Sequence, residues 1–579
     1  MKKTLMRIKD ITYPHKALII RASIIAVLIE LINIIRPYLI KIAIDDYYAL
    51  GVMVKDGLTI YALMSIYIAL VVIGNAIDFY NTMQTNILGE MIVEELREKV
   101  FIYSQLTNVT FHNKIPTGTL YARIINDVDD VSIMFKDVIA TLFKDVVSII
   151  IVLIFIFVIN WKIGLFVFCI MPFAAKVSKF LSNGINRIYK ASKVVRANTN
   201  AFLAESIYGE KVIKVFNIQS KKQEELESFT SKFRRVRVPS SFYEALFPGF
   251  IYSLKFFVLS IIIYVSALNL FNIHLNVGII YVLVDYITYL FQPINNIVEN
   301  IETIQDAIVS INKLYDMMDK TDYLEDIESG KELKNVIGKL EFRNVWFAYK
   351  DEKWVLKNIS FVIEPGETIA LVGKTGAGKT TIINLVNRFY EIQRGEILLD
   401  GVNINKYKLK DLRKRVGIVL QDPFIFYGEI KNNIKLNKDL NDETINYAVK
   451  MASADRFINS QTNGINEIAQ ERGENFSAGQ KQLIAFARIF AHNPDIFILD
   501  EATANIDTNS EKLIQKSINI LSKEKTAIFI AHRLATIVNV DKILVLKDGE
   551  IIESGKHNEL LGQGGYYSKL YNAYYQSNE

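Results

Sequence analysis

Cysteine is almost absent from this 579-residue sequence, which contains only Cys169, inside an apolar run. A single cysteine excludes an internal disulfide framework and a cysteine-ligated metal site. An excess of one charge is lacking too, because 67 basic and 62 acidic residues leave a formal net charge of +5. So small an excess over this length gives no reason to expect nucleic-acid binding.

Hydrophobic residues, in contrast, are abundant. They make up 51% of the chain, and the mean hydropathy is +0.20. Charged residues still account for 22%, so the chain cannot lie in a membrane throughout. We expect a mixed protein of about two to four domains, part in a bilayer and part in water. The basic N-terminus, MKKTLMRIKDITYPHK, lacks the short apolar core and cleavage site of a signal peptide.

Six long apolar runs lie in the first half of the chain. Each has roughly the 20 residues that a helix needs to cross about 30 Å of hydrocarbon. Helices of a large soluble all-α core, the competing interpretation, are rarely so long and so apolar. The runs cover residues 18–44, 57–80, 138–160, 162–184, 246–270 and 276–298. We therefore predict an all-α transmembrane domain with six helices over residues 1–320.

The connections between these runs differ in length and charge. Two of them, 81–137 and 185–245, are long, polar and helical in pattern, and 185–245 is rich in lysine and arginine. The three short connections carry little positive charge beyond Lys55 and Lys162. Because basic residues near span ends mark the cytoplasmic side, we expect both long links and both termini to lie in the cytoplasm.

A few charged residues fall within the predicted spans, where each needs a partner or a function. At 1.5 Å per residue, Lys144, Asp145 and Lys255 lie roughly 22 Å below the outer face. Two arrangements are compatible with this depth: an ion pair between Asp145 and Lys255, or separate contacts of these residues with a water-filled pathway. We favour structural pairing over substrate binding. For Glu30 and Asp285 the sequence favours neither interpretation.

The pattern changes in the second half, where short β-rich runs alternate with helical patterns. The runs include TIALVG (368–373), DIFILD (495–500) and TAIFIAH (526–532). Such alternation predicts an α/β domain with a mainly parallel sheet. We place this domain at 338–579, after a charged linker at 321–337.

GKTGAGKT (373–380) fits the phosphate-loop pattern G-x-x-x-x-G-K-[ST] and lies between an apolar strand and a predicted helix. Its glycines let the backbone wrap phosphates, Lys379 neutralises the β and γ oxygens, and Thr380 offers a hydroxyl to Mg²⁺. The predicted nucleotide-binding residues here are Gly373, Thr375, Gly376, Gly378, Lys379, Thr380 and Thr381. The motif predicts nucleotide binding, but it does not indicate which process the nucleotide drives.

Polar residues follow other apolar strands of this domain. IFILDEAT ends in Asp500, well placed for Mg²⁺, and Glu501, which can accept a proton from an attacking water. The alternative, a pair of solvated acids, is disfavoured by a phosphate loop in the same domain. His532 ends the run FIAH, and Gln421, just past another strand, can ligate Mg²⁺ or water. Tyr349 can stack on adenine or can equally be a core residue.

In this order, these motifs resemble the nucleotide-binding domain of ABC transporters, an α/β P-loop NTPase with a helical subdomain. The six upstream runs resemble the membrane part of B-type half-transporters, the multidrug and lipid exporters. The resemblance extends over essentially the whole chain and implies a multi-pass cell-membrane protein that couples ATP hydrolysis, with Mg²⁺, to export. It assigns catalytic roles to Gln421, Glu501 and His532, and adenine stacking to Tyr349. The expected Mg²⁺ ligands are Thr380, Gln421 and Asp500. Asp507 belongs to the D-loop, and the signature loop contains Ser477, Gly479 and Gln480.

The signature stretch, ERGENFSAGQKQ (471–482), departs from the family's Leu-Ser-Gly-Gly-Gln at Phe476 and Ala478. In the family, ATP on one P-loop is covered by the signature loop of a second domain, so the resemblance implies an obligate dimer. An altered signature beside an intact Glu501 resembles one subunit of a heterodimeric exporter, with a homodimer as the alternative. We expect Ala478 to restrict a loop in which glycine freely adopts positive φ.

Two stretches of the long links resemble the coupling loops of the family. They are GTLYARIINDVDDV (118–131) and ESIYGEKVIKVFN (205–217), the second of which reaches the partner's nucleotide domain in the family. A plain solvated hairpin, the alternative, would expose Ile213, Val215 and Phe216. The expected partners are thus a second half-transporter, the lipid bilayer and a small amphipathic or lipid substrate.

Three other functions share part of this pattern. A soluble ABC ATPase acting on DNA or ribosomes would have the nucleotide motifs without six spans. Importers usually carry their membrane and ATPase parts on separate chains. A peptide exporter that cleaves a leader would need an N-terminal cysteine-protease domain. The sequence therefore favours an ATP-driven exporter, although it leaves the substrate open.

Overall fold

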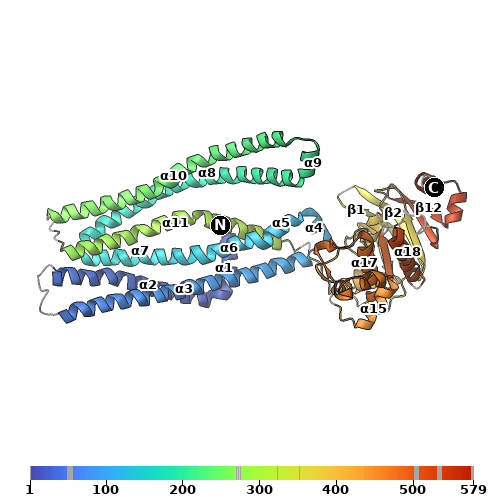
Figure 1. Cartoon of the computed structure of the whole chain (residues 1–579), viewed down its shortest axis with the longest axis horizontal. Coiled ribbons are helices and arrows are strands. Elements are labelled where there is room, and N and C mark those ends of the chain that lie inside the picture. The colour runs from blue at the N-terminus through green and yellow to red at the C-terminus, as the bar shows by residue number, and fades with distance from the viewer. Residues whose placement is uncertain are drawn as a thin grey trace. The chain divides into compact units, whose positions relative to one another are not determined.

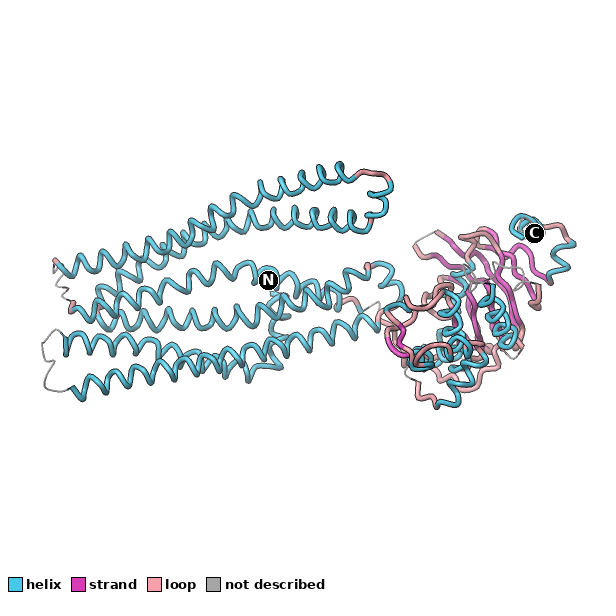
Figure 2. Tube along the Cα trace, viewed as in Figure 1, coloured by secondary structure: helices cyan, strands magenta, loops and turns pink. Residues whose placement is uncertain are grey.

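The computed structural model describes residues 2–48, 57–268, 270, 273, 275–321, 324–350, 353–436, 438–500, 508–523, 525–530 and 538–575. The chain forms two compact units. The helical unit comprises Met1–Leu106 and Ile115–Asp322, and the nucleotide unit comprises Thr107–Lys114 and Tyr323–Glu579. Within the described residues, every strand belongs to the nucleotide unit, as Figure 2 shows.

Long helices make up the helical unit (Figure 1). Six stretches of the described residues are long and apolar enough to cross a membrane, which confirms the predicted spans. In an apolar solvent the backbone must satisfy its hydrogen bonds internally, and a continuous helix does so. The helices are α1 (Lys2–Thr12), α2 (Lys16–Ile42), α3 (Gly57–Leu106), α5 (Thr117–Ala122), α6 (Val128–Ile133), α7 (Ala140–Ile159), α8 (Trp161–Tyr208), α9 (Glu210–Val215), α10 (Gln219–Ala267) and α11 (Val277–Met318).

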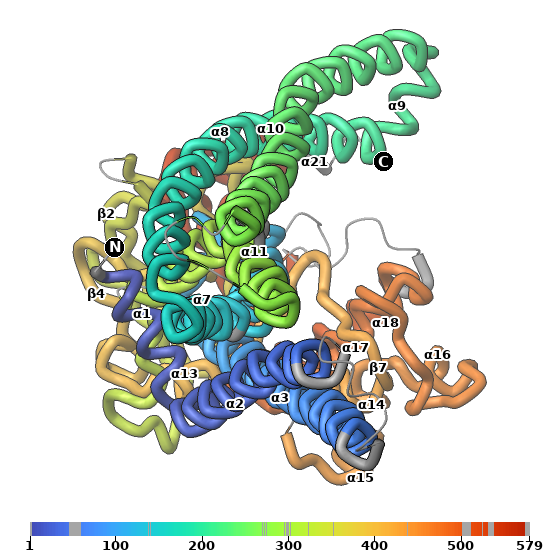
Figure 3. Tube along the Cα trace, turned by 90° about the vertical axis from the view of Figure 1, so that its left-hand side faces the viewer, coloured from blue at the N-terminus to red at the C-terminus, as the bar shows by residue number. Residues whose placement is uncertain are grey.

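The spans pack in pairs. Viewed along the bundle in Figure 3, α2 lies beside α3 and α8 lies beside α10, while α7 and α11 pack against each other and against α2. The core between α7, α8, α10 and α11 is built from buried aliphatic and aromatic side chains. Tyr286 of α11 is fully buried there, and its hydroxyl donates to the Ile34 carbonyl of α2 at 2.9 Å. A buried phenol thus has the partner that it needs.

The charges within the spans pair differently from the proposed Asp145–Lys255 contact, which is wrong. Asp145 accepts hydrogen bonds from Asn296 Nδ2 at 3.1 Å. Lys255 lies over the ring of Phe256, 4.8 Å from its centroid, on its own helix. Lys144 pairs instead with Asp78 at 3.1 Å. Register along each helix places these residues at similar depth, but depth alone does not determine which face of the helix each side chain occupies.

Glu30 is the second carboxylate near Lys144, since its Oε1 lies 4.0 Å from the ammonium. Glu30 is buried in α2, Lys144 belongs to α7 and Asp78 to α3. Three neighbouring helices therefore share one charge cluster. Structural pairing, favoured from the sequence for Lys144, is what the structure has.

The nucleotide unit is built on two sheets and a small ribbon. A six-stranded sheet has the order β12-β11-β3-β10-β9-β6, with neighbouring strands parallel except for β11 and β12. An antiparallel sheet has the order β2-β1-β4-β5. The strands are β1 (Leu340–Ala348), β2 (Trp354–Ile363), β3 (Thr368–Val372), β4 (Arg394–Leu399), β5 (Val402–Asn403), β6 (Val416–Val419), β7 (Gly428–Glu429), β8 (Ile468–Ala469), β9 (Ile496–Asp500), β10 (Thr526–Ile530), β11 (Lys542–Lys547) and β12 (Glu550–Gly555).

Apolar cores cover both faces of the six-stranded sheet. Strands β3 and β10 are buried at every position, as expected for parallel strands enclosed on both sides. One core lies toward the antiparallel sheet and α12, and the other lies toward α15, α17 and α18. The helices are α4 (Val109–Lys114), α12 (Lys379–Val386), α13 (Leu409–Arg415), α14 (Ile430–Lys435), α15 (Asp442–Met451), α16 (Asp455–Asn459), α17 (Ala478–His492), α18 (Thr508–Ser522), α20 (His557–Gly562) and α21 (Tyr566–Tyr575).

The coupling role predicted for residues 118–131 stays a prediction, and the structure shows how this stretch packs. Residues 118–131 belong to the helical unit, where Ser310 of α11 donates to Asp127 at 3.0 Å and to Asp130 at 2.9 Å. The neighbouring segment Thr107–Lys114, which contains α4, packs with the nucleotide unit instead. Two of the acidic residues of 118–131 therefore accept hydrogen bonds from α11.

Candidate nucleotide-binding site

The phosphate loop connects β3 to α12 and depends on its glycines. Gly376 and Gly378 have φ of +87° and +104°, which L side chains rarely adopt. A Cβ on Gly373 would lie 2.4 Å from the Leu546 carbonyl oxygen of β11, so that position is closed to any larger residue. The loop backbone therefore wraps tightly at the carboxyl end of a buried parallel strand, and its N–H groups can converge on an anion.

Lys379 is the first residue of α12, and its side chain turns back into the loop. The residue is only 6% exposed, and its ammonium donates to the carbonyls of Gly373 at 2.5 Å and Lys374 at 3.3 Å. The charge is thus held where the loop would surround a phosphate. Thr375 and Thr380 are exposed at the same loop, and the neighbouring Thr381 is buried.

An aromatic cluster borders the loop. Tyr349, at the end of β1, packs edge-on against Phe347 and Tyr390, with ring centroids 4.8 Å and 5.0 Å away. The Tyr349 and Thr381 hydroxyls share a hydrogen bond of 3.1 Å. One ring face of the half-exposed Tyr349 is therefore fixed beside the phosphate loop, which suits stacking on a planar base.

Tyr390 is a residue of this cluster that sequence reasoning missed. Its hydroxyl accepts a hydrogen bond of 2.6 Å from Asn113 in α4. The segment Thr107–Lys114 therefore contacts the aromatic cluster next to Tyr349. The sequence gives a weak signal for this, because NRFY follows the phosphate-loop helix, but nothing in it pairs Tyr390 with a residue 277 positions away.

Two strands bring the remaining acids and amides to the same sheet edge. Asp500 ends β9, and β9 is parallel to β10, whose last residue Ile530 lies opposite Asp500. Carboxyl ends of parallel strands meet at one edge, the edge at which β3 enters the phosphate loop. Glu501 follows Asp500 directly, but Glu501, Asp507 and His532 lie outside the described residues, so their predicted roles stay predictions.

Gln421 follows β6 and is exposed at this edge. Its backbone is held from α17, because Gln482 Nε2 donates to the carbonyls of Leu420 at 3.1 Å and Gln421 at 2.7 Å. Gln482 is 1% exposed and was also missed. An amide on the buried face of an amphipathic helix was its only signal in the sequence.

Arg488, two turns further along α17, fixes the segment after Gln421. Its guanidinium donates to the carbonyls of Phe424 at 2.7 Å and Asn433 at 2.6 Å. Burial lowers the pKa of Arg488 to about 10, so the group still carries its charge at neutral pH. Helix α17, which begins at the signature loop, therefore donates hydrogen bonds to both ends of the segment 421–433.

The signature loop is a well-formed helix start. Ser477 is the N-cap of α17, and it forms a capping box in which the Ser477 N–H donates to Gln480 Oε1 at 2.9 Å. Phe476 is buried against Phe457, with centroids 5.5 Å apart. Gly479 is buried as well, whereas Ser477 and Ala478 are exposed.

The expected backbone restriction at Ala478 is wrong. Ala478 is the first residue of α17 and is not among the non-glycine residues with positive φ. Alanine suits a helical position, so the backbone carries no strain there. What distinguishes Ala478 from glycine is only its methyl group, which projects from an exposed helix start.

The described residues fit a nucleoside triphosphate with Mg²⁺. A buried ammonium and glycines with positive φ form an anion cradle, and Tyr349 offers a ring face beside it. The Thr380 hydroxyl, the Asp500 carboxylate and the Gln421 amide are oxygen donors of the kind that Mg²⁺ prefers. This donor set arises from three separate elements that end at one edge of the sheet.

Comparison with protein families gives two matches in this one chain. Residues 19–294 match the ABC transporter transmembrane region. Residues 356–504 match the ABC transporter family. The first match covers all but the outermost residues of the predicted spans, and the second includes the phosphate loop and Asp500.

Curated relatives resemble the chain over most of its length. It is 33% identical over 507 residues to the ABC transporter ATP-binding protein exp8 of Streptococcus pneumoniae, covering 87% of each chain. It is 34% identical over 485 residues to YheH of Bacillus subtilis, described as a multidrug resistance ABC transporter ATP-binding/permease protein, covering 83% of this chain and 72% of that one. It is 28% identical to the ATP-dependent lipid A-core flippase of Syntrophus aciditrophicus, covering 98% and 93%.

Among solved structures, the fold resembles a bacterial Atm1-family ABC exporter with ATP bound. The TM-score is 0.79 at 23% sequence identity, and the match covers 96% of this chain and 98% of the other. Both units therefore have the arrangement of elements found in that fold.

Proposed function

The chain belongs to the ABC transporter family, and from that premise we propose that it is one half of a two-chain exporter for amphipathic or lipid-like molecules. It is an ATP-driven exporter subunit, with its membrane part and its ATPase part in one polypeptide. The observation that carries the two-chain proposal is that the chain has one P-loop and one signature helix. The resemblance pairs each P-loop with the signature loop of another domain.

The site residues have these proposed roles. Tyr349 stacks on the adenine, and the P-loop backbone with Lys379 holds the β and γ phosphates. Thr380, Asp500 and Gln421 would hold Mg²⁺, which would supply positive charge to the transferring phosphate. Glu501 accepts the proton of the attacking water, and His532 orients the γ-phosphate. Ser477, Gly479 and Gln480 close over the ATP of the partner.

A heterodimer is the assembly we favour. This chain supplies a complete P-loop and a catalytic glutamate, whereas its signature loop carries Phe476 and Ala478. In a heterodimer that loop covers the second, weakly hydrolytic ATP site. A homodimeric lipid or drug flippase is the alternative. The sequence alone counts against it, because alanine replaces the glycine of the family pattern. The helical geometry of Ala478 weakens that argument, because alanine fits the loop without strain.

The second long link supports a partner surface. Near its tip, apolar side chains are exposed in the single chain, with exposed fractions of 73% for Ile207, 79% for Val215 and 70% for Phe216. Exposed apolar clusters in a soluble region mark contact surfaces. We propose that α9 and its neighbours dock on the nucleotide unit of the partner, as the resemblance implies.

Orientation follows from charge. The long links are the basic ones, so we place them, the nucleotide unit and both termini in the cytoplasm. The substrate then leaves the cytoplasm when ATP is hydrolysed on the same side. The relatives named for multidrug resistance and for a lipid A-core flippase make drug-like and lipid-like molecules the first classes to test; a peptide substrate is less favoured.

Purification from native membranes with a tag on this chain tests the proposal. We expect a second, related half-transporter to co-purify in equal amount. Inside-out vesicles containing the pair should accumulate an amphipathic fluorescent dye or a labelled lipid only when ATP is added outside. A stable monomer with full ATPase activity would contradict the two-chain site. ATP use without movement of any dye or lipid would contradict the proposed substrates.

A further inference from the structure

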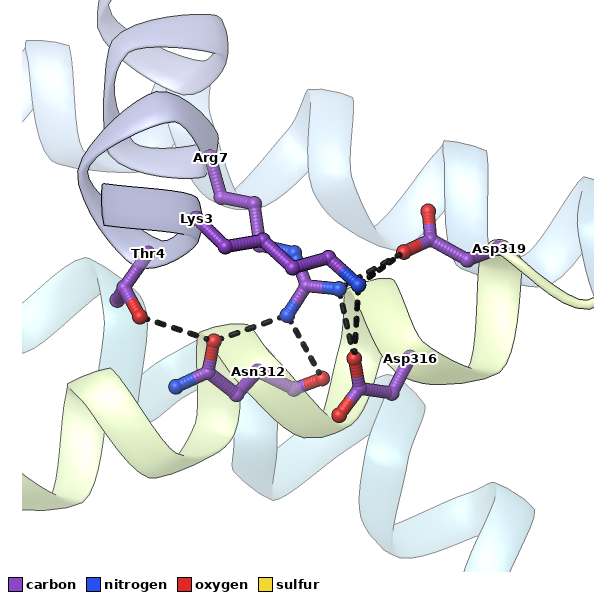
Figure 4. A network of polar contacts seen from close by, with 6 residues as sticks. All are labelled: Lys3, Thr4, Arg7, Asn312, Asp316 and Asp319. Carbon is purple, nitrogen blue, oxygen red and sulfur yellow. Dashed lines mark hydrogen bonds and ion pairs between the residues drawn. The ribbon is translucent and has the colours of Figure 1, made fainter. Parts of the chain in front are cut away.

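The N-terminal helix α1 docks on the cytoplasmic end of α11, and no step of ATP binding uses it. Arg7 and Ile11 share one face of α1 at a spacing of four residues and are both buried. Lys3 extends that face by one turn. Figure 4 shows the polar groups of α1 and the end of α11 pointing toward one another.

Arg7 makes the central contacts. Its guanidinium donates to Asp316 at 2.6 Å, to Asp319 at 2.8 Å and to Asn312 Oδ1 at 2.9 Å, and it lies over the Tyr315 ring. The Arg7 side chain is 5% exposed, whereas the two carboxylates are 63% and 49% exposed. The cation is therefore the buried partner, and the carboxylates reach it from the surface.

Neighbouring residues of α1 complete the network. Lys3 Nζ lies 3.2 Å from Asp319, and Thr4 donates to Asn312 Oδ1 at 3.3 Å. Lys3 and Arg7 balance the two carboxylates in charge. Hydrogen bonds from Arg7 lower the pKa of both Asp316 and Asp319, so both stay ionised near neutral pH.

The position of these acids is unusual for a helix end. Asp316 lies in the last turn of α11 and Asp319 is its C-cap, and that last turn has no basic residue. The carboxyl end of a helix carries partial negative charge and favours cations. Here α1 supplies the cations that α11 lacks. Docking of α1 thus stabilises the acidic end of α11 electrostatically.

This helix end is also where the helical unit ends along the chain. The helical unit extends to Asp322, three residues beyond Asp319. On the far side, Arg413 of α13 holds Glu325 with bonds of 2.6 Å and 2.9 Å within the nucleotide unit. This short covalent connection after α11 is one of three places where the chain passes between the two units.

We propose that Arg7 is a positioning residue for coupling, which fixes the end of α11 so that α1 and α11 move as one body during transport. The proposal rests on the proposed export function, because coupling is defined only for a transported substrate. Its physical basis is the near-complete burial of a permanently charged group with several bonds to one short stretch of helix.

The central test compares Arg7→Gln with Lys9→Gln, a control on the exposed side of the same helix. Both are measured in the reconstituted dimer for transport, for ATPase rate and for the KM of ATP. Arg7→Gln should lower transport per ATP hydrolysed by about threefold to thirtyfold, with the KM of ATP unchanged. Arg7→Lys should recover part of the ratio. Equal loss of transport and ATPase activity would make Arg7 merely structural and overturn the proposal.

A cross-link tests whether the two helices move together. Thr4→Cys and Asn312→Cys, placed in a Cys169→Ser background that has no other cysteine, are joined by a short reducible cross-linker. Transport should continue in the joined protein. Loss of transport that a reducing agent restores would show that the contact opens during the cycle, and the single-body proposal would be wrong.

Limited trypsin digestion separates this proposal from the proposed function, because it needs no transported substrate. Docking predicts faster cleavage after Lys313 or Lys320 in Arg7→Gln than in the wild type or Lys9→Gln. Unchanged cleavage would overturn the docking. Faster cleavage in a protein whose wild type moves no dye or lipid would leave the docking intact and refute the export substrates instead.

Discussion

The P-loop and the signature loop both precede a helix and both contain small residues, yet they are built differently. The P-loop needs positive φ at Gly376 and Gly378 and buries Lys379 inside itself. The signature loop has ordinary helical geometry, and Ser477 and Gln480 bond to each other. The P-loop is thus shaped as an anion cradle, whereas we propose that the signature loop closes over the ATP of the partner. Variants on the P-loop side should therefore have the larger effects.

The largest effect is expected at Glu501, which follows Asp500 in the sequence. Glu501→Gln removes the proposed proton acceptor while keeping its shape, so turnover should fall about 10²–10⁴-fold. ATP binding should remain. Steady-state ATPase rate and nucleotide titration of the purified dimer measure the two quantities. Glu550→Gln, at an exposed position of β12, is the control, and a rate within a few-fold of wild type would remove Glu501 from its role.

Lys379→Ala comes next. The lost ammonium contacts phosphates in the ground state as well as in the transition state, so affinity should weaken about 10- to 100-fold along with the rate. Lys374→Ala, in the same loop but exposed, should change affinity little. Fluorescent-nucleotide titration of both variants measures the difference. Equal affinity for ATP in Lys379→Ala and wild type would contradict the cradle.

A smaller effect is expected for Gln482, which links the signature helix to the backbone of Gln421. Gln482→Leu removes two hydrogen bonds, so we expect about a 2- to 10-fold loss of ATPase rate. ATP affinity should be unchanged, because Gln482 does not face the cradle. Gln563→Leu at an exposed position is the control. If Gln482→Leu weakened ATP affinity and left the ATPase rate unchanged, the signature helix would contribute to ATP binding at the P-loop of its own chain, contrary to this prediction.

The smallest effect is expected at Ala478, where it also distinguishes the two assemblies. Ala478→Gly removes one exposed methyl group and should change ATP retention at the covered site. In a heterodimer, overall turnover should stay within a few-fold, because that loop covers the weak site. In a homodimer the same loop covers both hydrolytic sites, and turnover should change directly. ATPase rate and nucleotide occlusion are measured together. A large rate change with no second chain present would refute the heterodimer.

Much of this molecule could be predicted from local patterns. The six spans follow from the lengths of apolar runs, and the P-loop follows from glycines and a lysine at fixed spacing. Both signals are contained in contiguous stretches. The expected restriction at Ala478 assumed a loop with positive φ, but Ala478 is the first residue of α17, after the capping box of Ser477 and Gln480, and has no positive φ.

Contacts between distant segments could not be predicted in the same way. Nothing near Lys255 in the sequence shows that its ammonium faces Phe256 rather than Asp145. Likewise, Asn113 and Tyr390 meet only because α4 folds against the nucleotide unit. The rotation of each helix about its axis and the tertiary packing determine which of these residues are in contact. Neither can be read from a single sequence.

The length of α3 has a mechanical consequence. Its 50 residues extend for about 75 Å at 1.5 Å per residue, of which only about 30 Å can lie in hydrocarbon. About 45 Å therefore projects as one stiff rod, and a tilt of about 5° would sweep its far end through about 4 Å. Any tilt of α3 would thus be amplified at its far end in proportion to the length that extends beyond the bilayer.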